Sequence, residues 1–547
     1  MKTRYLILFL FSLLVTASGL AGLPPIDRDE ARFVQSTRQM VETGDYLDIR
    51  LQETTRYKKP IGIYWLQSAS VAMSGQGAEA PIWVYRMVSA LGVALAVVAV
   101  AWTGAGLFGA NAGLAAGLVV ATLFATAFEG HIAKTDAMLL ACCVLAQGAL
   151  ARIYVASRRQ EAADFRLPWL FWIAQGVGIL IKGPIAPLLS GLTILTLFVF
   201  DRDGRWLSKL KPVRGSALAG LIVLPWLILI TWRSGGAFWQ EAVGKDLLAK
   251  VAQGEESHGA PPGYYVLTYS LFMWPFGLLA IGAGLQALNR VRADVRLRFC
   301  LAWYIPFWLL FELVPTKLPH YVLPAYPALA LLIGWALTLP SNEANMPLRT
   351  WQVWLWRLAA FGLAVVTIGL AALCVAAPLY LVGTFVWWSI PAAAAVVLAG
   401  YFAFSTDMAV PLQRIGAAAA SVAVAYVLLF GVIAPSLTPM WLSPRIAQAF
   451  EAIRPCGNSV LASAGFHEPS LVFLVGTKTL LTDTQGAARH LLADPACAMA
   501  LIPLQDGETL KNLLNQAGRT ASPVALVEGI NYSSGDALSL VLYHVSN

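Results

Sequence analysis

The chain has 547 residues, of which 58% are hydrophobic and only 12% charged, and its formal net charge at pH 7 is +8. Together with a mean hydropathy of +0.66, this composition excludes a water-soluble globular protein and predicts a chain that crosses a membrane many times. The loops that flank the apolar stretches account for the excess of basic residues, so we expect no nucleic acid partner.

Stretches long enough to span a membrane, which takes ~20 mainly apolar residues, recur along most of the chain. The fold class that they predict is an all-α polytopic membrane protein of about thirteen transmembrane helices, followed by a small C-terminal α/β domain. A cleaved signal peptide is the alternative for residues 1–23, because a basic "MKTR" precedes the apolar run and "TASGLAGL" ends it. The expected spans lie near residues 5–23, 82–102, 112–130, 136–156, 168–184, 185–201, 215–232, 264–284, 299–314, 321–339, 357–380, 383–403 and 414–435.

The basic residues of the short loops predict the orientation of the chain. Lys and Arg collect on the cytoplasmic side, which places the loops 157–166, 201–215 and 289–298 there. Counting through the spans then puts the N-terminus in the cytoplasm, and the first loop, the loop 233–263 and the end of the chain outside. The first loop is also basic, but it is long, and long loops follow the rule poorly.

From about residue 436 the composition becomes that of a water-exposed domain. We therefore divide the chain into a transmembrane domain, residues 1–435 with the outer loop 24–80, and an outer α/β domain, residues 436–547. Strand-like runs are "SVLASAG", "SLVFLVG", "AMALIPL", "SPVALVEG" and "LSLVLYHV", and "GETLKNLLNQAG" reads as a helix. Cys456 and Cys497 lie outside the membrane, where a disulfide or two free thiols are both open, whereas Cys142 and Cys143 are packing residues of a span.

Ionisable residues gather at the predicted outer face. They lie in the stretches "PPIDRDEARF", "RYKKPIGIYW", "EGHIAKTDAMLL", "LIKGPIAPLL" and "PTKLPHYVLPAYP". Helix capping or snorkelling to lipid headgroups explains any one of them equally well. Taken together, acids and bases at one leaflet predict a site for a phosphate-bearing amphiphile, in which lysines pair with the phosphate and a carboxylate acts beside the reacting carbon.

The motifs "DRDEARF", "YKKPIGIYW", "KTDAMLL", "IKGPIAPLL" and "TKLPHYVLPAYPALALL" follow one another in this order. The series resembles the polytopic glycosyltransferases of the GT-C class, and within it the aminoarabinose transferases of lipid A and their protein mannosyltransferase-like relatives. The resemblance implies an enzyme of the bacterial inner membrane that takes a sugar from an undecaprenyl phosphate carrier. Transfer to lipid A or another envelope acceptor would occur on the periplasmic face, with inversion at the anomeric carbon.

The resemblance also assigns candidate residues. By the resemblance, Asp29 takes the position of the carboxylate near the anomeric centre and Asp136 matches the second acidic position. Glu30 is a further catalytic candidate. Either Glu30 or Arg32 is expected to position Asp29, and Asp27 is expected to be mainly a helix cap. Lys59 matches the lysine that meets the carrier phosphate. Supporting phosphate contacts are Lys58, Lys182 and Lys317, and further substrate contacts are Arg32, Tyr57, His258, Tyr264, His320 and Tyr321, of which His258 and Tyr264 belong to an outer loop that folds over the site.

The sequence departs from the family pattern in two places. Many relatives carry an acidic residue, a possible metal ligand, immediately before the phosphate lysine, whereas this chain has Lys58. We therefore expect no metal and no cofactor, and leave a divalent metal near Glu255, Glu256 and His258 as the alternative. The outer loop also lacks the arginine expected beside His258, which weakens the assignment of aminoarabinose as the sugar.

Three other functions stay open. A secondary transporter should show interrupted helices in matched halves and charges at the bilayer midplane. A flippase or ligase for carrier-linked glycans would share the lipid but not the paired acids Asp29 and Asp136. A protein O-mannosyltransferase-like enzyme would use a protein acceptor. No dinucleotide or phosphate-loop fingerprint occurs in the sequence, so a soluble nucleotide-sugar donor is disfavoured.

Overall fold

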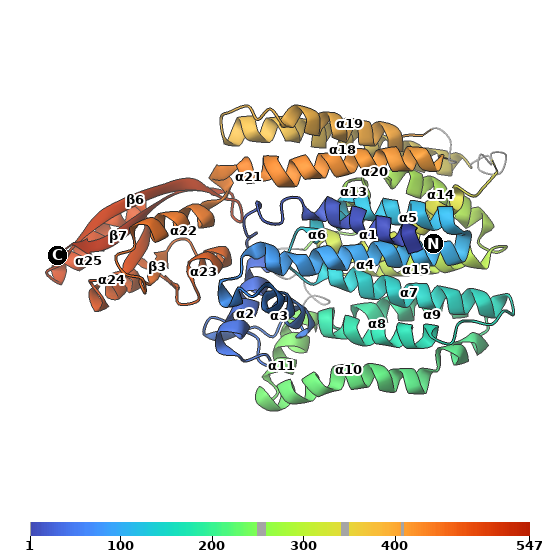
Figure 1. Cartoon of the computed structure of the whole chain (residues 1–547), viewed down its shortest axis with the longest axis horizontal. Coiled ribbons are helices and arrows are strands. Elements are labelled where there is room, and N and C mark those ends of the chain that lie inside the picture. The colour runs from blue at the N-terminus through green and yellow to red at the C-terminus, as the bar shows by residue number, and fades with distance from the viewer. Residues whose placement is uncertain (1, 249–258, 341–348, 406–409, 547) are drawn as a thin grey trace.

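The computed structural model describes residues 2–248, 259–340, 349–405 and 410–546. A long helical bundle occupies most of the chain, and a smaller α/β unit lies at one end of it (Figure 1). The bundle helices are α1 (Lys2–Ala17), α4 (Ile82–Phe108), α5 (Ala110–Thr122), α6 (Phe124–Gly130), α7 (Asp136–Arg158), α8 (Leu167–Lys182), α9 (Ile185–Asp201), α10 (Pro212–Arg233), α13 (Tyr264–Phe272), α14 (Gly277–Arg290), α15 (Val295–Leu313), α16 (Tyr326–Ala336), α18 (Thr350–Leu381), α19 (Ser389–Ala403) and α20 (Leu412–Leu428).

Among the described residues, five helices are long and apolar enough to cross a membrane, namely α4, α7, α10, α18 and the stretch Leu412–Ser436. Two bent pairs, α5 with α6 and α13 with α14, raise the number to seven if each pair is one span. Every predicted span contains helix, but the count of about thirteen is not confirmed. Several of these helices are short, such as the 16 residues of α1, and α15 carries Arg296, Arg298 and Glu312 within it.

The two ends of the bundle differ in what they carry. At one end, Asp201 at the end of α9 pairs with Arg158 of α7 at 2.7 Å and with Arg298 of α15; we call this the basic end. The opposite end carries the loop 24–80 and the α/β unit, and we call it the domain end (Figure 1). The basic loops 157–166, 201–215 and 289–298 therefore lie together, away from the predicted site.

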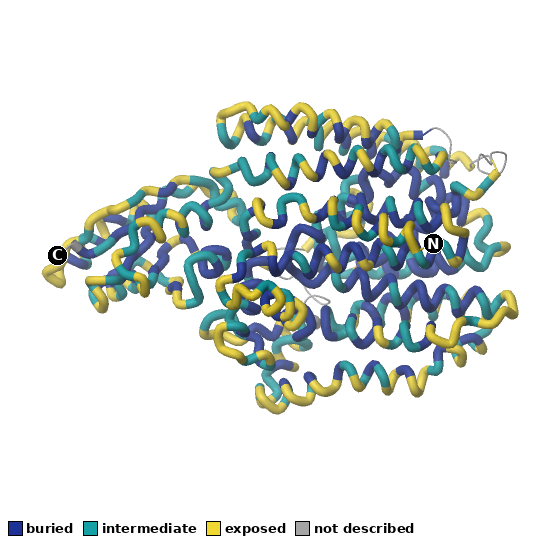
Figure 2. Tube along the Cα trace, in the orientation of Figure 1, coloured by how far each residue is buried: buried dark blue, intermediate teal, exposed yellow. Residues whose placement is uncertain are grey.

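The inner helices of the bundle are buried, whereas α10, α18 and α19 expose much of their surface (Figure 2). Trp351 and Trp354 are exposed near the start of α18, and Tyr380, Trp387 and Trp388 are exposed near its end and just after it. Aromatic side chains at both ends of an apolar helix are typical of the two membrane–water interfaces. The exposed face of α18 is therefore a lipid-facing surface.

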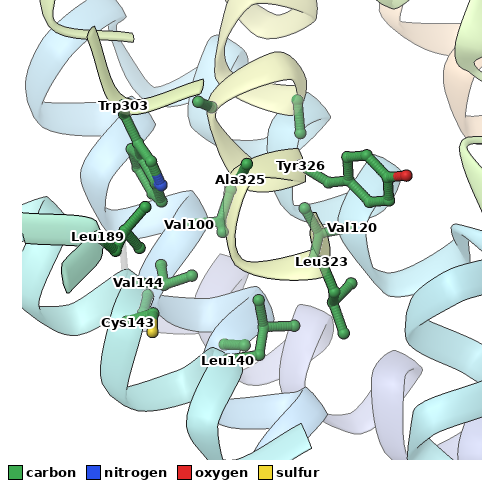
Figure 3. Close-up of a cluster of buried hydrophobic side chains, with 14 of the residues drawn as sticks. Val100, Val120, Leu140, Cys143, Val144, Leu189, Trp303, Leu323, Ala325 and Tyr326 are labelled. Carbon is green, nitrogen blue, oxygen red and sulfur yellow. The ribbon is translucent and has the colours of Figure 1, made fainter. Parts of the chain in front are cut away.

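The core of the bundle is apolar and closely packed. Figure 3 shows Val100, Val144 and Leu189 beside Trp303, Ala325 and Tyr326, all of them buried. The Trp303 indole donates to the carbonyl of Pro324 at 2.9 Å, which ties α15 to the 3-10 helix η4 (Pro319–Ala325). This contact fixes the segment that carries His320 and Tyr321. Cys142 and Cys143 are buried in α7, as expected of packing residues.

The first loop folds into short elements at the domain end. It contains α2 (Asp29–Thr43), the hairpin strands β1 (Arg50–Leu51) and β2 (Thr54–Thr55), and α3 (Gly62–Ser74). Gly44 ends α2 with a φ of 72°, a left-handed conformation that glycine adopts without strain. The loop is thus an ordered cap on the bundle.

The C-terminal α/β unit contains a sheet of five strands in the order β4-β3-β5-β7-β6. β3 (Leu461–Ala464) is parallel to β4 (Leu480–Thr482) and to β5 (Met499–Pro503), and β7 (Asp536–Ser546) is antiparallel to β5 and to β6 (Thr520–Asn531). Cys456 and Cys497 form a disulfide across 41 residues of sequence. The helices of the unit are α22 (Leu442–Ile453), α23 (Pro469–Val475), α24 (Thr484–Ala493) and α25 (Gly507–Gln516).

One predicted strand of this unit is wrong. The run "SLVFLVG" forms α23, which has Pro469 at its first turn, a position that favours helix because proline presets the backbone angle there. A short apolar run does not distinguish a strand from a buried helix. Here Leu471, Val472 and Phe473 are all buried, so contacts on several sides stabilise the helix.

Candidate active site

Asp29 is the first residue of α2 and is exposed at the domain end. The residue before it, Arg28, has a φ of 67°, in the left-handed region that is costly for a side chain with a Cβ. No side chain caps α2, and Asp27 instead accepts a hydrogen bond from the backbone N–H of Ser470 at 3.2 Å. The prediction that Asp27 caps the helix is therefore wrong, because the α/β unit supplies the donor for its carboxylate.

The charges around Asp29 keep its carboxylate ionised. Desolvation by the surrounding protein would raise the pKa of Asp29, but Lys134 and Arg56 outweigh it, so that the pKa lies below its ordinary value. An ionised carboxylate can stabilise positive character on a neighbouring carbon or accept a proton. Asp29 therefore has the protonation state that either role requires.

Glu30, the next residue, is fully buried in an ion pair with Arg86 of α4. One carboxylate oxygen accepts from Arg86 Nη2 at 2.7 Å, and the other from Arg86 Nε at 2.8 Å and from the backbone N–H of Ala133 at 2.7 Å. Arg86 also donates to the carbonyls of Leu20, Leu23 and Pro24. These contacts differ from the catalytic role expected of Glu30, because its oxygens are engaged in holding α2 against α4.

A second set of charges lies around the start of α7. Lys182, the last residue of α8, donates to Asp136 at 2.6 Å. Lys134 lies 3.1 Å from Glu129 of α6 and 3.8 Å from Asp136. His320 stands between the two acids, with Nδ1 3.7 Å from Glu129 and Nε2 3.7 Å from Asp136. The structure thus joins three of the predicted motifs in one cluster, which we call the charge cluster: Glu129, Lys134, Asp136, Lys182 and His320.

Burial controls the protonation of His320. Desolvation, with the charge of Lys134 next in importance, lowers its pKa to about 3, and Asp136 offsets this only in part. The imidazole is therefore neutral at pH 7 and can donate one hydrogen bond and accept another. His131, by contrast, points away from the cluster, since its ring nitrogens contact the carbonyls of Ala127 and Ser18.

Lys59 lies on the segment between β2 and α3. Its ammonium pairs at 2.8 Å with Asp246, which belongs to the π-helix Gln240–Leu248 of the loop after α10. Tyr57, two residues earlier, is buried and donates to Asp48 at 2.6 Å, so its hydroxyl is used within the first loop rather than aimed at a substrate. Arg56 is also buried, 5.0 Å from the ring centroid of Phe33.

Lys317 is bound to the C-terminal end of α15. Its ammonium donates to the carbonyls of Phe311, Glu312 and Val314 at 2.7 to 3.0 Å. A lysine has three N–H donors, so all of them are used, and the structure favours a helix-capping role over the phosphate contact that was expected. The Glu312 carboxylate in turn accepts from the backbone N–H groups at the start of α13, including that of Tyr265 at 3.0 Å.

The remaining predicted residues are spread along the same end. Tyr321 lies beside Lys182, whose ammonium is 5.5 Å from its ring centroid. Arg32 and Tyr264 are half-buried and Lys58 is exposed. His258, like Glu255 and Glu256, lies outside the described residues.

Several residues of the site were not selected from the sequence. Glu129 and Lys134 were noted there only as members of a motif, and Arg86 and Asp246 were missed. A lone arginine within the apolar stretch 82–102 is costly in a membrane and was the signal that could have found Arg86. Asp246 had no such signal, because its pairing with Lys59 joins segments far apart in the sequence.

The described residues of the site do not form a metal site. In the described part of the chain, no three His, Cys, Asp or Glu side chains are grouped so that they could hold a metal ion. The acids Asp136 and Asp246 already pair with lysines, and a cation would have to compete with those ammonium groups.

Comparison with known proteins supports a likeness in sequence. The family model described as dolichyl-phosphate-mannose-protein mannosyltransferase matches residues 58–229. The undecaprenyl phosphate-alpha-4-amino-4-deoxy-L-arabinose arabinosyl transferase of Aeromonas salmonicida is 26% identical over 66% of this chain and 65% of its own length. The enzyme of that name from Pseudomonas aeruginosa PAO1 is 27% identical over 68% of the chain and 65% of its own length. The matched region thus spans slightly less than two thirds of these relatives.

The solved structures show the fold. ArnT from Cupriavidus metallidurans bound to undecaprenyl phosphate superposes with a TM-score of 0.74 over 99% of this chain and 98% of its own, at 18% identity. The oligosaccharyltransferase of Archaeoglobus fulgidus gives 0.53 over 92% of this chain and 70% of its own, at 12% identity. The resemblance to the GT-C glycosyltransferases is therefore confirmed: the chain has the fold of ArnT and is similar in sequence to the aminoarabinose transferases.

Proposed function

We propose that the chain is a membrane glycosyltransferase that moves a sugar from a polyprenyl phosphate carrier to an acceptor. The observation that carries this proposal is the placement of Asp29 and Asp136 with Lys59, Lys134 and Lys182 at one end of an apolar bundle. A donor with a charged phosphate and a long apolar tail needs a charged site for the phosphate and an apolar surface for the tail. The names of the relatives and of the bound ligand of ArnT support undecaprenyl phosphate as the carrier.

The reaction breaks the bond between the anomeric carbon and the phosphate oxygen and forms a bond between that carbon and an acceptor oxygen on the opposite face. The bonding electrons leave with the phosphate, whose charge Lys59 and Lys182 stabilise once they exchange their carboxylate partners for it. Asp29 stabilises the positive character of the carbon. A hydroxyl acceptor passes its proton to Asp29, whereas a phosphate acceptor is already ionised and needs no base.

The finer assignments follow from the same reasoning. We infer that residues 1–435 carry the transferase, that residues 436–547 form a periplasmic domain, and that the chain lies in the inner membrane with a cytoplasmic N-terminus. The disulfide between Cys456 and Cys497 supports an oxidising compartment for the domain end. Lipid A is the proposed acceptor and aminoarabinose the proposed sugar.

A protein acceptor is the second candidate, because the family model that matches residues 58–229 is that of protein mannosyltransferases. Mass spectrometry of lipid A from cells with and without the gene separates the two. We expect a mass addition on lipid A that needs the gene. An unchanged lipid A spectrum together with a lost glycan on an envelope protein would favour the second candidate.

The catalytic role of Asp29 predicts that Asp29→Asn abolishes transfer. The amide keeps the size of the side chain but removes the charge that stabilises the carbon, so we expect a loss of at least about 100-fold in kcat. Release of polyprenyl phosphate from a lipid-linked sugar in purified membranes is the measurement. Glu53→Gln is the matched control, since Glu53 is an exposed acid of the same loop. Wild-type turnover by Asp29→Asn would exclude the role given to this residue.

A further inference from the structure

The residues directly before Asp29 are held by a turn from the far end of the chain. The Tyr532 hydroxyl, in the turn between β6 and β7, accepts from the backbone N–H of Asp27 at 2.7 Å. The Arg28 guanidinium donates to the carbonyl of Ser533 at 2.6 Å, and Asp27 accepts from Ser470. Since the backbone of Arg28 is in the left-handed region, surrounding contacts must hold this strained conformation.

The C-terminal α/β unit also contacts α2 along the length of the helix. Arg38 donates to the carbonyl of Phe473 at 2.7 Å, and Gln35 donates to the Thr477 hydroxyl at 2.8 Å. Thr477 in turn donates to Glu42 at 2.7 Å. The helix that carries Asp29 thus has one row of polar contacts along α23 and the loop that follows it.

An apolar contact anchors this interface. Phe473 is only 4% exposed, and its ring packs edge-on against Tyr85 of α4, with the ring centroids 5.6 Å apart. Its cluster includes Val34 of α2, Val71 of α3 and Ala133. Ala133 is the residue whose N–H binds Glu30, so the cluster includes residues of both the helix of Asp29 and the segment before Asp136.

These contacts are not needed to build the sheet. The two apolar clusters of the α/β unit lie between its own strands and helices, with Leu501, Leu540 and Leu542 in one and Ala500, Ile502 and Val541 in the other. The unit therefore has a core of its own, and its interface with α2 is an additional property of its surface.

We propose that the C-terminal α/β unit is a positioning element for the reaction, in which Tyr532 and Phe473 hold the Asp27–Arg28 turn and α2 so that Asp29 faces the charge cluster. The kinetic part of this inference rests on the proposed transferase activity. A catalytic group misplaced by about 1 Å can cost on the order of 100-fold in rate. Tyr532 and Phe473 act through Asp29 and do not touch the substrate.

The first test is kinetic. Tyr532→Phe removes the acceptor for the Asp27 N–H and keeps the ring that packs on Trp441. We expect kcat to fall roughly tenfold while KM for the lipid-linked donor changes less than about twofold. Phe473→Ala should behave in the same way, and Phe473→Leu, which keeps an apolar anchor, should recover most of the rate. The control is Tyr543→Phe, a buried tyrosine of β7 away from α2.

The second test does not depend on activity. Asp29→Cys introduces an exposed thiol into a chain whose described cysteines are otherwise buried or in the disulfide. A charged maleimide should label position 29 at a rate that changes several-fold when Tyr532→Phe or Phe473→Ala is added, and that Tyr543→Phe leaves unchanged. Unchanged labelling together with unchanged kcat in the Tyr532 and Phe473 variants would overturn the inference. Absence of transfer by the wild-type protein would instead refute the proposed function, while the labelling rates still decide the positioning role.

Discussion

Two lysines that the sequence treats alike have different partners in the structure. Lys182 pairs with Asp136 at 2.6 Å within the charge cluster. Lys317 instead donates to three backbone carbonyls at the end of α15. A cation that pairs with a carboxylate side chain can exchange it for a phosphate. A cation that closes a helix end cannot do so without exposing three carbonyls.

This difference predicts that replacement of each lysine by methionine has a different main effect. Lys182→Met should raise KM for the lipid-linked donor by about tenfold or more, because a phosphate contact is removed. Lys317→Met should lower the free energy of unfolding by about 2 kcal/mol, because charged hydrogen bonds to α15 are lost. Donor titrations and thermal unfolding of both variants give the comparison. A raised KM in a fully stable Lys317→Met protein would return Lys317 to the phosphate site.

Asp27 predicts a pH dependence of stability. Burial raises its pKa to about 6, with the charge of Glu468 adding to the effect and hydrogen bonds from Ser470 and Tyr532 opposing it. Because the folded pKa lies above the ordinary value of 3.8, the folded state binds the proton more tightly than the unfolded state. The contribution of Asp27 to stability is therefore present at low pH and is lost as the pH rises through about 6.

Asp27→Asn removes this titration and keeps an oxygen to accept from Ser470. We expect the variant to be more stable than the wild-type protein at pH 8, by at most about 3 kcal/mol, and equally stable near pH 4. Thermal unfolding of the detergent-solubilised protein across this range measures the difference. A difference that does not grow with pH would show that the Asp27 carboxyl titrates normally.

At the scale of elements, three segments distant in sequence meet on the Glu30 carboxylate. It binds Arg86 of α4, the N–H of Ala133 before α7 and the N–H of Ile26 before α2. Each segment alone would leave a polar group unpaired in an apolar environment, which is costly. The buried pair therefore sets the position of α2 on the bundle, and with it the position of Asp29, the residue immediately before Glu30.

Replacing one member of this ion pair should lower the free energy of unfolding more than replacing both members. Arg86→Met or Glu30→Met leaves one buried charge without its partner, and we expect each to lower the free energy of unfolding by about 3 to 5 kcal/mol. The double variant Glu30→Met with Arg86→Met should recover part of that loss, because no unpaired charge remains. A strictly additive loss in the double variant would mean that the two side chains do not act as a pair.

At the scale of the molecule, the segregation of basic loops to one end predicts the topology. A cysteine replacing Glu53 in the first loop should react with a membrane-impermeant maleimide in intact cells, whereas one replacing Gln160 should react only after permeabilisation, because Lys- and Arg-rich short loops stay in the cytoplasm. Both positions are exposed. Labelling of both positions in intact cells would contradict the predicted orientation. The unsubstituted protein, whose Cys142 and Cys143 are buried, gives the background labelling.

The hydrophobic pattern and the order of the motifs could predict the helices, the α/β unit and part of the candidate site. The apolar stretches predicted helices, and composition located the α/β unit, since these features depend on local hydrophobicity and periodicity. Motif order indicated Asp29, Asp136, Lys59 and Lys182, which the structure places at one end of the bundle. The strand expected at residues 470–476 failed because a short apolar run has no preferred periodicity.

The sequence by itself determined that the chain is a helical membrane protein with charges at one end, because hydrophobicity and charge are local properties of each segment. Only the tertiary structure decided which charges pair. The ion pairs of Glu30 and Lys59 join distant segments, and the hydrogen bond between Tyr532 and the turn before Asp29 joins residues 505 positions apart. Hydrogen bonds and ion pairs depend on distances of a few ångströms, and packing of the whole chain sets those distances.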